Sequence, residues 1–160
     1  MNPQMVMHEA EYHRITEVCD RLTREANARV VFLVDKNGQL IASSGSTQDI
    51  DTVSLASLTA GNIAATGGLA RLIGEKEFSI LFHEGERDNL HISIVGQRVI
   101  LVVLFDARSS LGLVRLRVKK ASEELNAIFE HLQRKAELPG GANTLFAEIT
   151  DEDIDNLFKE

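Results

Sequence analysis

The sequence predicts an α+β fold in which helices cover both faces of an antiparallel sheet. Hydrophobic periodicity gives the order helix, hairpin, helix, three-stranded meander, helix. The segments VVFLV (30–34) and VILVVLF (99–105) are continuously apolar, which is typical of central strands buried on both faces. The 160 residues are 44% hydrophobic and 26% charged, a globular composition in a chain of single-domain length.

The first elements are a helix and a hairpin. Apolar residues at spacings of three and four predict an amphipathic helix over 6–28. A strand over 29–34 and its return over 39–43 flank the turn 35–38, in which Asn-Gly can supply a positive φ. The polar loop 44–51 follows. The inward residues predicted for the first helix are Ile15, Val18, Leu22 and Ala26.

A second helix is predicted from Thr52 to about Gly74, with Asp51 or Thr52 as its cap. Three strands are then expected over Glu77–His83, Asn89–Val95 and Val99–Phe105. The last helix extends from Asp106 to about Glu137, with Ser109 or Ser110 as its cap, and its apolar stripe is Leu111, Val114, Val118, Ala121, Leu125, Ile128 and Leu132.

Pro139-Gly140-Gly141 breaks the chain after the last helix. We therefore expect one domain over 1–138, followed over 139–160 by a flexible linker and an acidic tail.

The second helix has no charged residue from Thr52 to Ala70. Its polar and small residues argue against a membrane span. Large apolar side chains cluster on one side, at Leu55, Leu58, Leu69 and Leu72. The opposite side is small, although a solvated side would normally carry Lys and Glu. Two interpretations remain open for it: burial within the fold, or a protein–protein surface that serves as a dimer seam or a partner platform. The platform residues would be Ser57, Ala60, Gly61, Ala64, Gly67, Gly68 and Arg71.

Composition and motifs exclude several functions. A net charge of -7 argues against nucleic-acid binding. The sequence has no phosphate-binding glycine loop, nucleophile elbow or zinc-protease motif, and no histidine has metal-site spacing. We therefore expect no catalytic residue, no metal and no cofactor. A single cysteine, Cys19, and an N-terminus without an apolar signal run predict a cytoplasmic protein.

Two charged segments could bind partners. The basic run RLRVKK (115–120) is either a solvated face or a docking patch for an acidic partner or the protein's own tail. The tail FAEITDEDIDNLFKE (146–160) combines a good N-cap, Thr150, with acids that favour the helix dipole. A helix this short is unstable alone, so we expect it to order on docking, although a solubilising role is the alternative. The expected docking residues are Ile154, Leu157, Phe158, Asp151, Asp153 and Asp155.

Three segments together resemble the roadblock/dynein-light-chain family over about residues 7–137: VVFLVDKNGQLIASSG (30–45), LASLTAGNIAATGGLARLIGE (55–75) and VILVVLFDARSSLGLVRLRVKKASEEL (99–125). The tail resembles that of the family's motility subgroup. The resemblance implies a roadblock-type five-stranded antiparallel sheet in the order 2-1-5-4-3, with the central helix on one face and the first and last helices on the other. It also implies a homodimer joined through the third strand and the central helix.

The resemblance further implies that the paired central helices form a platform for a Ras-like small GTPase that controls cell polarity and gliding motility. The protein would activate that GTPase by repositioning the GTPase's own catalytic groups, without an active site of its own. It would lie in the cytoplasm, concentrated at a cell pole, and its tail would make a second contact with the GTPase. Arg71, Arg87 and Arg108 are candidate arginine fingers by residue type alone.

Two other functions stay open. A roadblock adaptor would bind the GTPase or other partners without stimulating hydrolysis. A small-ligand sensor would need a pocket with converging polar groups, which the sequence does not reveal.

Overall fold

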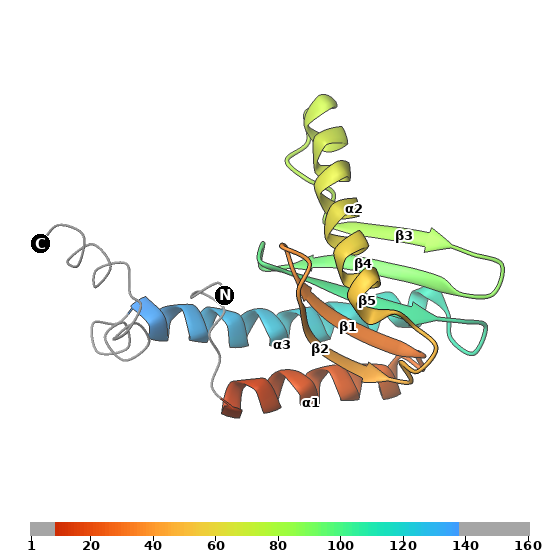
Figure 1. Ribbon diagram of the computed structural model, residues 1–160, viewed down its shortest axis with the longest axis horizontal. Helices are drawn as coiled ribbons and strands as arrows, with labels where there is room; N and C mark the ends of the chain where they lie inside the picture. The colour runs from red at the N-terminus through yellow and green to blue at the C-terminus, as the bar shows by residue number, and fades with distance from the viewer. Residues whose placement is uncertain (1–8, 138–160) are drawn as a thin grey trace, which may run out of the picture.

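The computed structural model describes residues 9–137, whose helices and strands follow the predicted order (Figure 1). The helices are α1 (Glu9–Glu25), α2 (Thr52–Leu72) and α3 (Leu111–Glu137). The strands are β1 (Val30–Asp35), β2 (Leu40–Gly45), β3 (Ile80–Glu84), β4 (Asn89–Val95) and β5 (Val99–Phe105). The linker and acidic tail expected after residue 138, and the first residues of the predicted 6–28 helix, lie outside the described residues.

The strands form one antiparallel sheet in the order β2-β1-β5-β4-β3, which confirms the predicted fold class and strand order. β1 pairs with β5 from Val30 opposite Leu104 to Asp35 opposite Val99. Every residue of these two central strands is buried, as their continuously apolar sequences predict. β2 and β3 are the two edge strands of the sheet.

Alternate side chains of the central strands enter two separate cores. Val31, Leu33 and Val103 join the core under α1 and α3, together with the predicted stripes of those helices. Phe32 and Val102 join the smaller core under α2. The helices are therefore divided two against one across the sheet, as predicted (Figure 1).

The ends of the elements depart from prediction where local hydrogen bonds intervene. Asn27 has a φ of 55°, so α1 ends at Glu25 rather than at residue 28. The last helix begins at Leu111 rather than Asp106, because Asp106 accepts hydrogen bonds from the Arg108 and Ser109 N–H groups in a turn. Ser110 then caps α3 by accepting from the Leu113 N–H at 3.2 Å.

α2 begins and ends as predicted. Asp51 is its N-cap and accepts a hydrogen bond from the Ser54 N–H at 3.1 Å, which lowers the pKa of the Asp51 carboxyl. Gly74 follows the last turn with a φ of 84°, a conformation that ends helices. Within residues 9–137 no helix is long and apolar enough to cross a membrane.

Candidate functional site on the outward sides of helix α2

α2 meets the rest of the protein through a narrow side of small and medium-sized residues. Ala56 and Thr59 are buried, and Ile63 packs partly against the core formed by β1, β4 and β5. Further along the helix Ala70 is buried as well, where the chain turns back and the Glu75 N–H donates to the Ala70 carbonyl at 2.8 Å. Leu55 of the leucine cluster and Ala60 of the small-residue face also pack partly against this core, but neither group as a whole forms the packed side.

The leucine side of α2 is largely exposed. Leu58, Leu69 and Leu72 are 72%, 58% and 84% exposed, and only Leu55 packs partly against the core. Figure 1 shows why: the second half of α2 projects beyond the sheet, past β3. The interpretation in which α2 is simply buried within its own fold is therefore wrong. A group of large apolar side chains exposed in this way marks an interaction surface.

The edge strand β3 lies beside this surface and is fixed to α2. His83 of β3 and Asn62 of α2 form a hydrogen bond, with Nε2 and Nδ2 2.9 Å apart. Two further apolar residues of β3, Ile80 and Phe82, are exposed on the opposite face of the sheet. The unpaired backbone groups of an edge strand are a template for pairing with another chain.

The expected platform residues form a strip along a third side of α2. Ser57, Gly61 and Ala64 are exposed, while Ala60, Gly67 and Gly68 are half-buried. The β1–β2 turn bounds the strip at one end, because a Cβ on Gly38 would lie 3.2 Å from the Ser57 Cα. At the other end a Cβ on Gly67 or Gly68 would lie 3.9 Å from a guanidinium nitrogen of Arg71.

The middle of the strip is open, since a Cβ on Gly61 would meet nothing within 4 Å. Apart from Arg71 at its end, the strip carries no charge. A surface of backbone and small side chains lets a partner approach the helix closely. Chemically this arrangement suits docking rather than catalysis.

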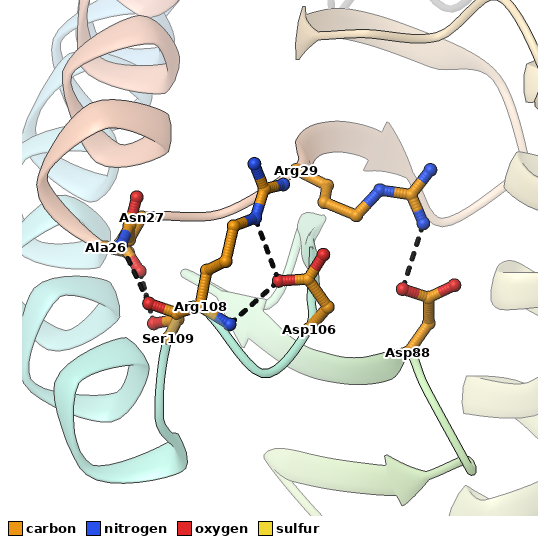
Figure 2. Close-up of polar contacts among 7 residues, drawn as sticks. All are labelled: Ala26, Asn27, Arg29, Asp88, Asp106, Arg108 and Ser109. Carbon is orange, nitrogen blue, oxygen red and sulfur yellow. Dashed lines mark hydrogen bonds and ion pairs between the residues drawn. The ribbon is translucent and has the colours of Figure 1, made fainter.

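The three candidate arginines come from three different parts of the chain. Arg71 lies at the end of α2 and is exposed. Arg108 follows β5, and its Nε pairs with Asp106 Oδ1 at 3.2 Å (Figure 2). Arg87 is exposed in the β3–β4 turn beside Asp88.

Figure 2 shows the polar cluster that surrounds Arg108 at one end of the sheet. Arg29 pairs with Asp88 at 2.9 Å, which raises the pKa of the Arg29 guanidinium. Hydrogen bonds from the backbone and side chain of Arg108 lower the pKa of Asp106. Asn27 Nδ2 donates to the Arg108 carbonyl at 2.8 Å. These contacts hold three connecting segments together, so the cluster has a structural role.

Two expectations from the sequence do not involve α2: the absence of a metal site, and the docking residues of the tail. In residues 9–137 no three metal-ligating side chains come together. The docking residues expected in the tail, Ile154, Leu157, Phe158, Asp151, Asp153 and Asp155, lie outside the described residues. The outward leucines were visible as a cluster in the sequence, but their exposure was not predicted because an apolar side of a helix usually faces its own core.

Comparisons with known proteins agree on one family. The model of the Roadblock/LC7 domain matches residues 14–105. The structure of Myxococcus xanthus MglB is 70% identical and covers 80% of this chain and 96% of that one, with a TM-score of 0.76. The gliding protein MglB from Thermus thermophilus is 38% identical and covers 82% of this chain and 99% of that one, also with a TM-score of 0.76. A structure of MglB with a tetrameric arrangement is 36% identical, with coverages of 82% and 99% and a TM-score of 0.77.

Proposed function

The chain belongs to the Roadblock/LC7 family, and we propose that it is a homodimeric GTPase-activating protein for a Ras-like small GTPase of the MglA type. The observation that carries this proposal is the 70% identity with Myxococcus xanthus MglB over 80% of the chain. As an MglB homologue the chain is a regulatory protein of gliding motility and not itself an enzyme. Its place of action is the cytoplasm, concentrated at the cell pole where its GTPase sets polarity.

A dimer accounts for the exposed apolar residues. In this dimer the β3 edges of two copies pair and the leucine sides of the two α2 helices pack together. Support comes from the exposure of Leu58, Leu69 and Leu72 beside an unpaired edge strand. Burying such side chains fully is worth roughly 1.5–3 kcal/mol each, which contributes to association.

The platform for the GTPase is the small-residue strip. At 100° per residue, the packed side, the leucine side and the small-residue strip of α2 lie roughly a third of a turn apart. When the leucine sides of two copies meet, both strips therefore point away from the sheet and form one continuous surface. Its contact residues are Ser57, Ala60, Gly61, Ala64, Gly67, Gly68 and Arg71. The tail residues named above make the second contact with the GTPase.

Activation proceeds by repositioning catalytic groups that the GTPase already has. A rigid uncharged platform can select one arrangement of the GTPase's mobile segments through shape, because small residues permit contact with backbone. The pairing of Arg108 with Asp106 weighs against its insertion as a finger.

Single-turnover GTP hydrolysis tests the proposal. The GTPase is loaded with GTP, and phosphate release is followed with and without the full-length chain. Faster release at saturating chain supports an activator. Binding with unchanged release would instead identify an adaptor and overturn the activating role.

A further inference from the structure

A groove lies on the face of the sheet opposite α2, between the β3–β4 edge and α3. It encloses about 460 Å³. Ile80, His91 and Ser93 line it from the strands, and Arg115, Val118 and Lys119 line it from α3. Ile80 of the edge strand is exposed there, so the groove is open at its β3 side.

Two polar side chains in the groove are buried without a hydrogen-bond partner. His91 is 1% exposed and Ser93 is 5% exposed. Among the described residues, neither ring nitrogen of His91 nor the hydroxyl of Ser93 has a hydrogen-bond partner. Burial, and secondarily Arg115, lower the pKa of His91, so its neutral ring offers one donor and one acceptor. Buried polar groups are almost always paired, and these atoms therefore point to an occupant with polar groups of its own.

The α3 wall of the groove is positively charged. Arg115 and Lys119 lie one helical turn apart, and within residues 9–137 neither forms an ion pair with a carboxylate. Arg117 of the same basic run turns the other way and pairs with Glu25 of α1 at 3.8 Å. Glu123 is the acidic residue among those that line the groove, and it lies one helical turn beyond Lys119. The positive charge is thus concentrated at the Arg115 end.

Apolar surface lies next to this charge. Ile80 and Phe82 of β3 are exposed, and the Phe82 ring stacks on Phe105 with the centroids 6.2 Å apart. Val118 adds an apolar contact from α3. An occupant that suits the groove is therefore both acidic and amphipathic.

We propose that this groove binds the chain's own acidic tail, residues 146–160, when no GTPase is bound. Six acids and one lysine between residues 139 and 160 complement the charge of Arg115 and Lys119. Ile154, Leu157 and Phe158 supply one short apolar face for Ile80, Phe82 and Val118. Backbone groups of the tail provide hydrogen-bond partners for His91 and Ser93, while its carboxylates meet Arg115 and Lys119.

The tail of the same chain is long enough to reach the groove. α3 ends at Glu137, and Glu123 at the near end of the groove lies about 21 Å back along that helix. Residues 138–150 can extend to about 43 Å at most. The apolar triplet of residues 154–158 can therefore return along α3 to the groove.

This inference goes beyond the proposed function. If the same triplet also contacts the GTPase, a tail held in the groove is withheld from the GTPase, and the two sites compete for it. Docking in the groove would thus lower the affinity of the tail for its partner.

Paramagnetic NMR on the full-length protein without GTPase tests the docking. A spin label is attached through Lys159→Cys; the native Cys19 is buried, which raises its pKa to about 12 and keeps it from reacting. We expect broadening of the Ser93 and Ser122 amide signals, in the groove, and none at Gly38 on the α2 face. Absence of broadening at Ser93 and Ser122 would overturn the proposal.

Neighbouring lysines provide a matched pair of variants. Lys119→Glu reverses a charge in the groove, whereas Lys120→Glu reverses the next charge, which lies in the α1–α3 seam. The first should abolish the broadening and the second should retain it; equal effects would contradict the assignment. Leu157→Ser with Phe158→Ser, two changes outside residues 9–137, should also abolish the broadening.

A mixed sample distinguishes the chain's own tail from the tail of another copy. Isotope-labelled chains without a spin label are mixed with unlabelled chains that carry one. Both chains also carry Leu69→Asp and Leu72→Asp at exposed positions of α2, because pairing of the β3 edges in the dimer would bring the label of one copy near the groove of the other. We expect no broadening in the labelled chains. Broadening there would show that another copy fills the groove and would overturn docking within one chain. Because no GTPase is present, neither outcome bears on the proposed activation.

Discussion

At the scale of single residues, the side chains of α2 are divided among three surroundings. Ala56 and Thr59 pack against the fold, Leu69 is exposed beside the β3 edge, and Ala64 is exposed between the glycines of the strip. A larger side chain would therefore disturb different contacts on each of the three sides. Substitutions on the three sides should therefore separate folding, dimerisation and GTPase binding from one another.

Ala64→Glu should prevent GTPase binding and leave the dimer folded. A bulky charge in the strip blocks close approach and would be buried unpaired in the complex, so we expect affinity to fall by roughly 2 kcal/mol or more. Ala127→Glu, a matched change at an exposed position of α3, should bind as the wild type does. Calorimetric titration with the GTP-bound GTPase measures the affinity of both variants. Undiminished binding by the Ala64 variant would show that the strip is not the platform.

Alanine substitutions of Arg71, Arg87 and Arg108 test the mechanism of activation. Loss of a true arginine finger costs roughly 10³ to 10⁵ in hydrolysis rate. Because we propose repositioning instead, we expect each variant to change the single-turnover rate at saturating concentration by less than about tenfold. A loss on the finger scale in any one of them would show that an arginine reaches the nucleotide.

His91 should make the protein less stable in mild acid. Its folded pKa lies below the ordinary value of 6.5, because burial disfavours the charged ring. The unfolded chain therefore binds the proton first as pH falls. Stability from this group is complete above pH 6.5 and declines below it, by up to about 1.4 kcal/mol per pH unit.

Urea unfolding between pH 7.5 and 5 measures this effect. His91→Gln should remove part of the slope, whereas His131→Gln, at an exposed position of α3, should retain it. If the free energy of unfolding of the wild type and of the His91 variant changed equally with pH, His91 would not be the source of the effect.

At the scale of elements, we propose that the exposed half of α2 and the edge strand β3 form the association surface. Leu69→Asp with Leu72→Asp should dissociate the dimer, because a carboxylate buried at an interface without a partner costs several kcal/mol. The monomer should stay folded, since both residues are exposed in the single chain. Sedimentation velocity measures the change. Leu116→Asp, at an exposed leucine of α3, is the control; a dimeric double variant would place the interface elsewhere.

The elements also show what local sequence can predict. β4 and β5 begin and end at the predicted residues, because each apolar run is bounded by turn residues. β3 was expected from Glu77 but begins at Ile80, since an edge strand exposed along most of its length carries little periodic signal. The packed side of α2 was not predictable, because periodicity distinguishes the sides of a helix but not which one meets the sheet.

The groove between the β3–β4 edge and α3 depends on the register in which the strands pair, and the sequence does not specify this register. Histidines 83 and 91 stand on neighbouring strands, yet His91 pairs across with Phe82 and His83 with Leu90, so the two point to opposite faces. His83 consequently contacts α2 while His91 lies under α3. Only the paired sheet places His91, Ser93 and the basic residues of α3 around one space.

At the scale of the whole molecule, we assign different binding functions to the two faces of the sheet. We propose that the α2 face provides dimer contacts and the platform, and that the α3 face provides the groove for the tail. The sheet order and the division of helices could be stated from the family resemblance and are confirmed. The dimer, the platform contacts and the tail's position stay predictions, since each involves a second molecule or residues outside 9–137.

Single-turnover GTP hydrolysis with three forms of the protein tests the activating role directly. These are the full-length chain, a shortened chain ending at Leu138, and the Leu69→Asp, Leu72→Asp monomer. We expect that the first two accelerate hydrolysis and that the monomer does not, because the platform needs two α2 helices. Bound GTPase with an unchanged hydrolysis rate for the full-length and shortened chains would instead show that the protein is an adaptor.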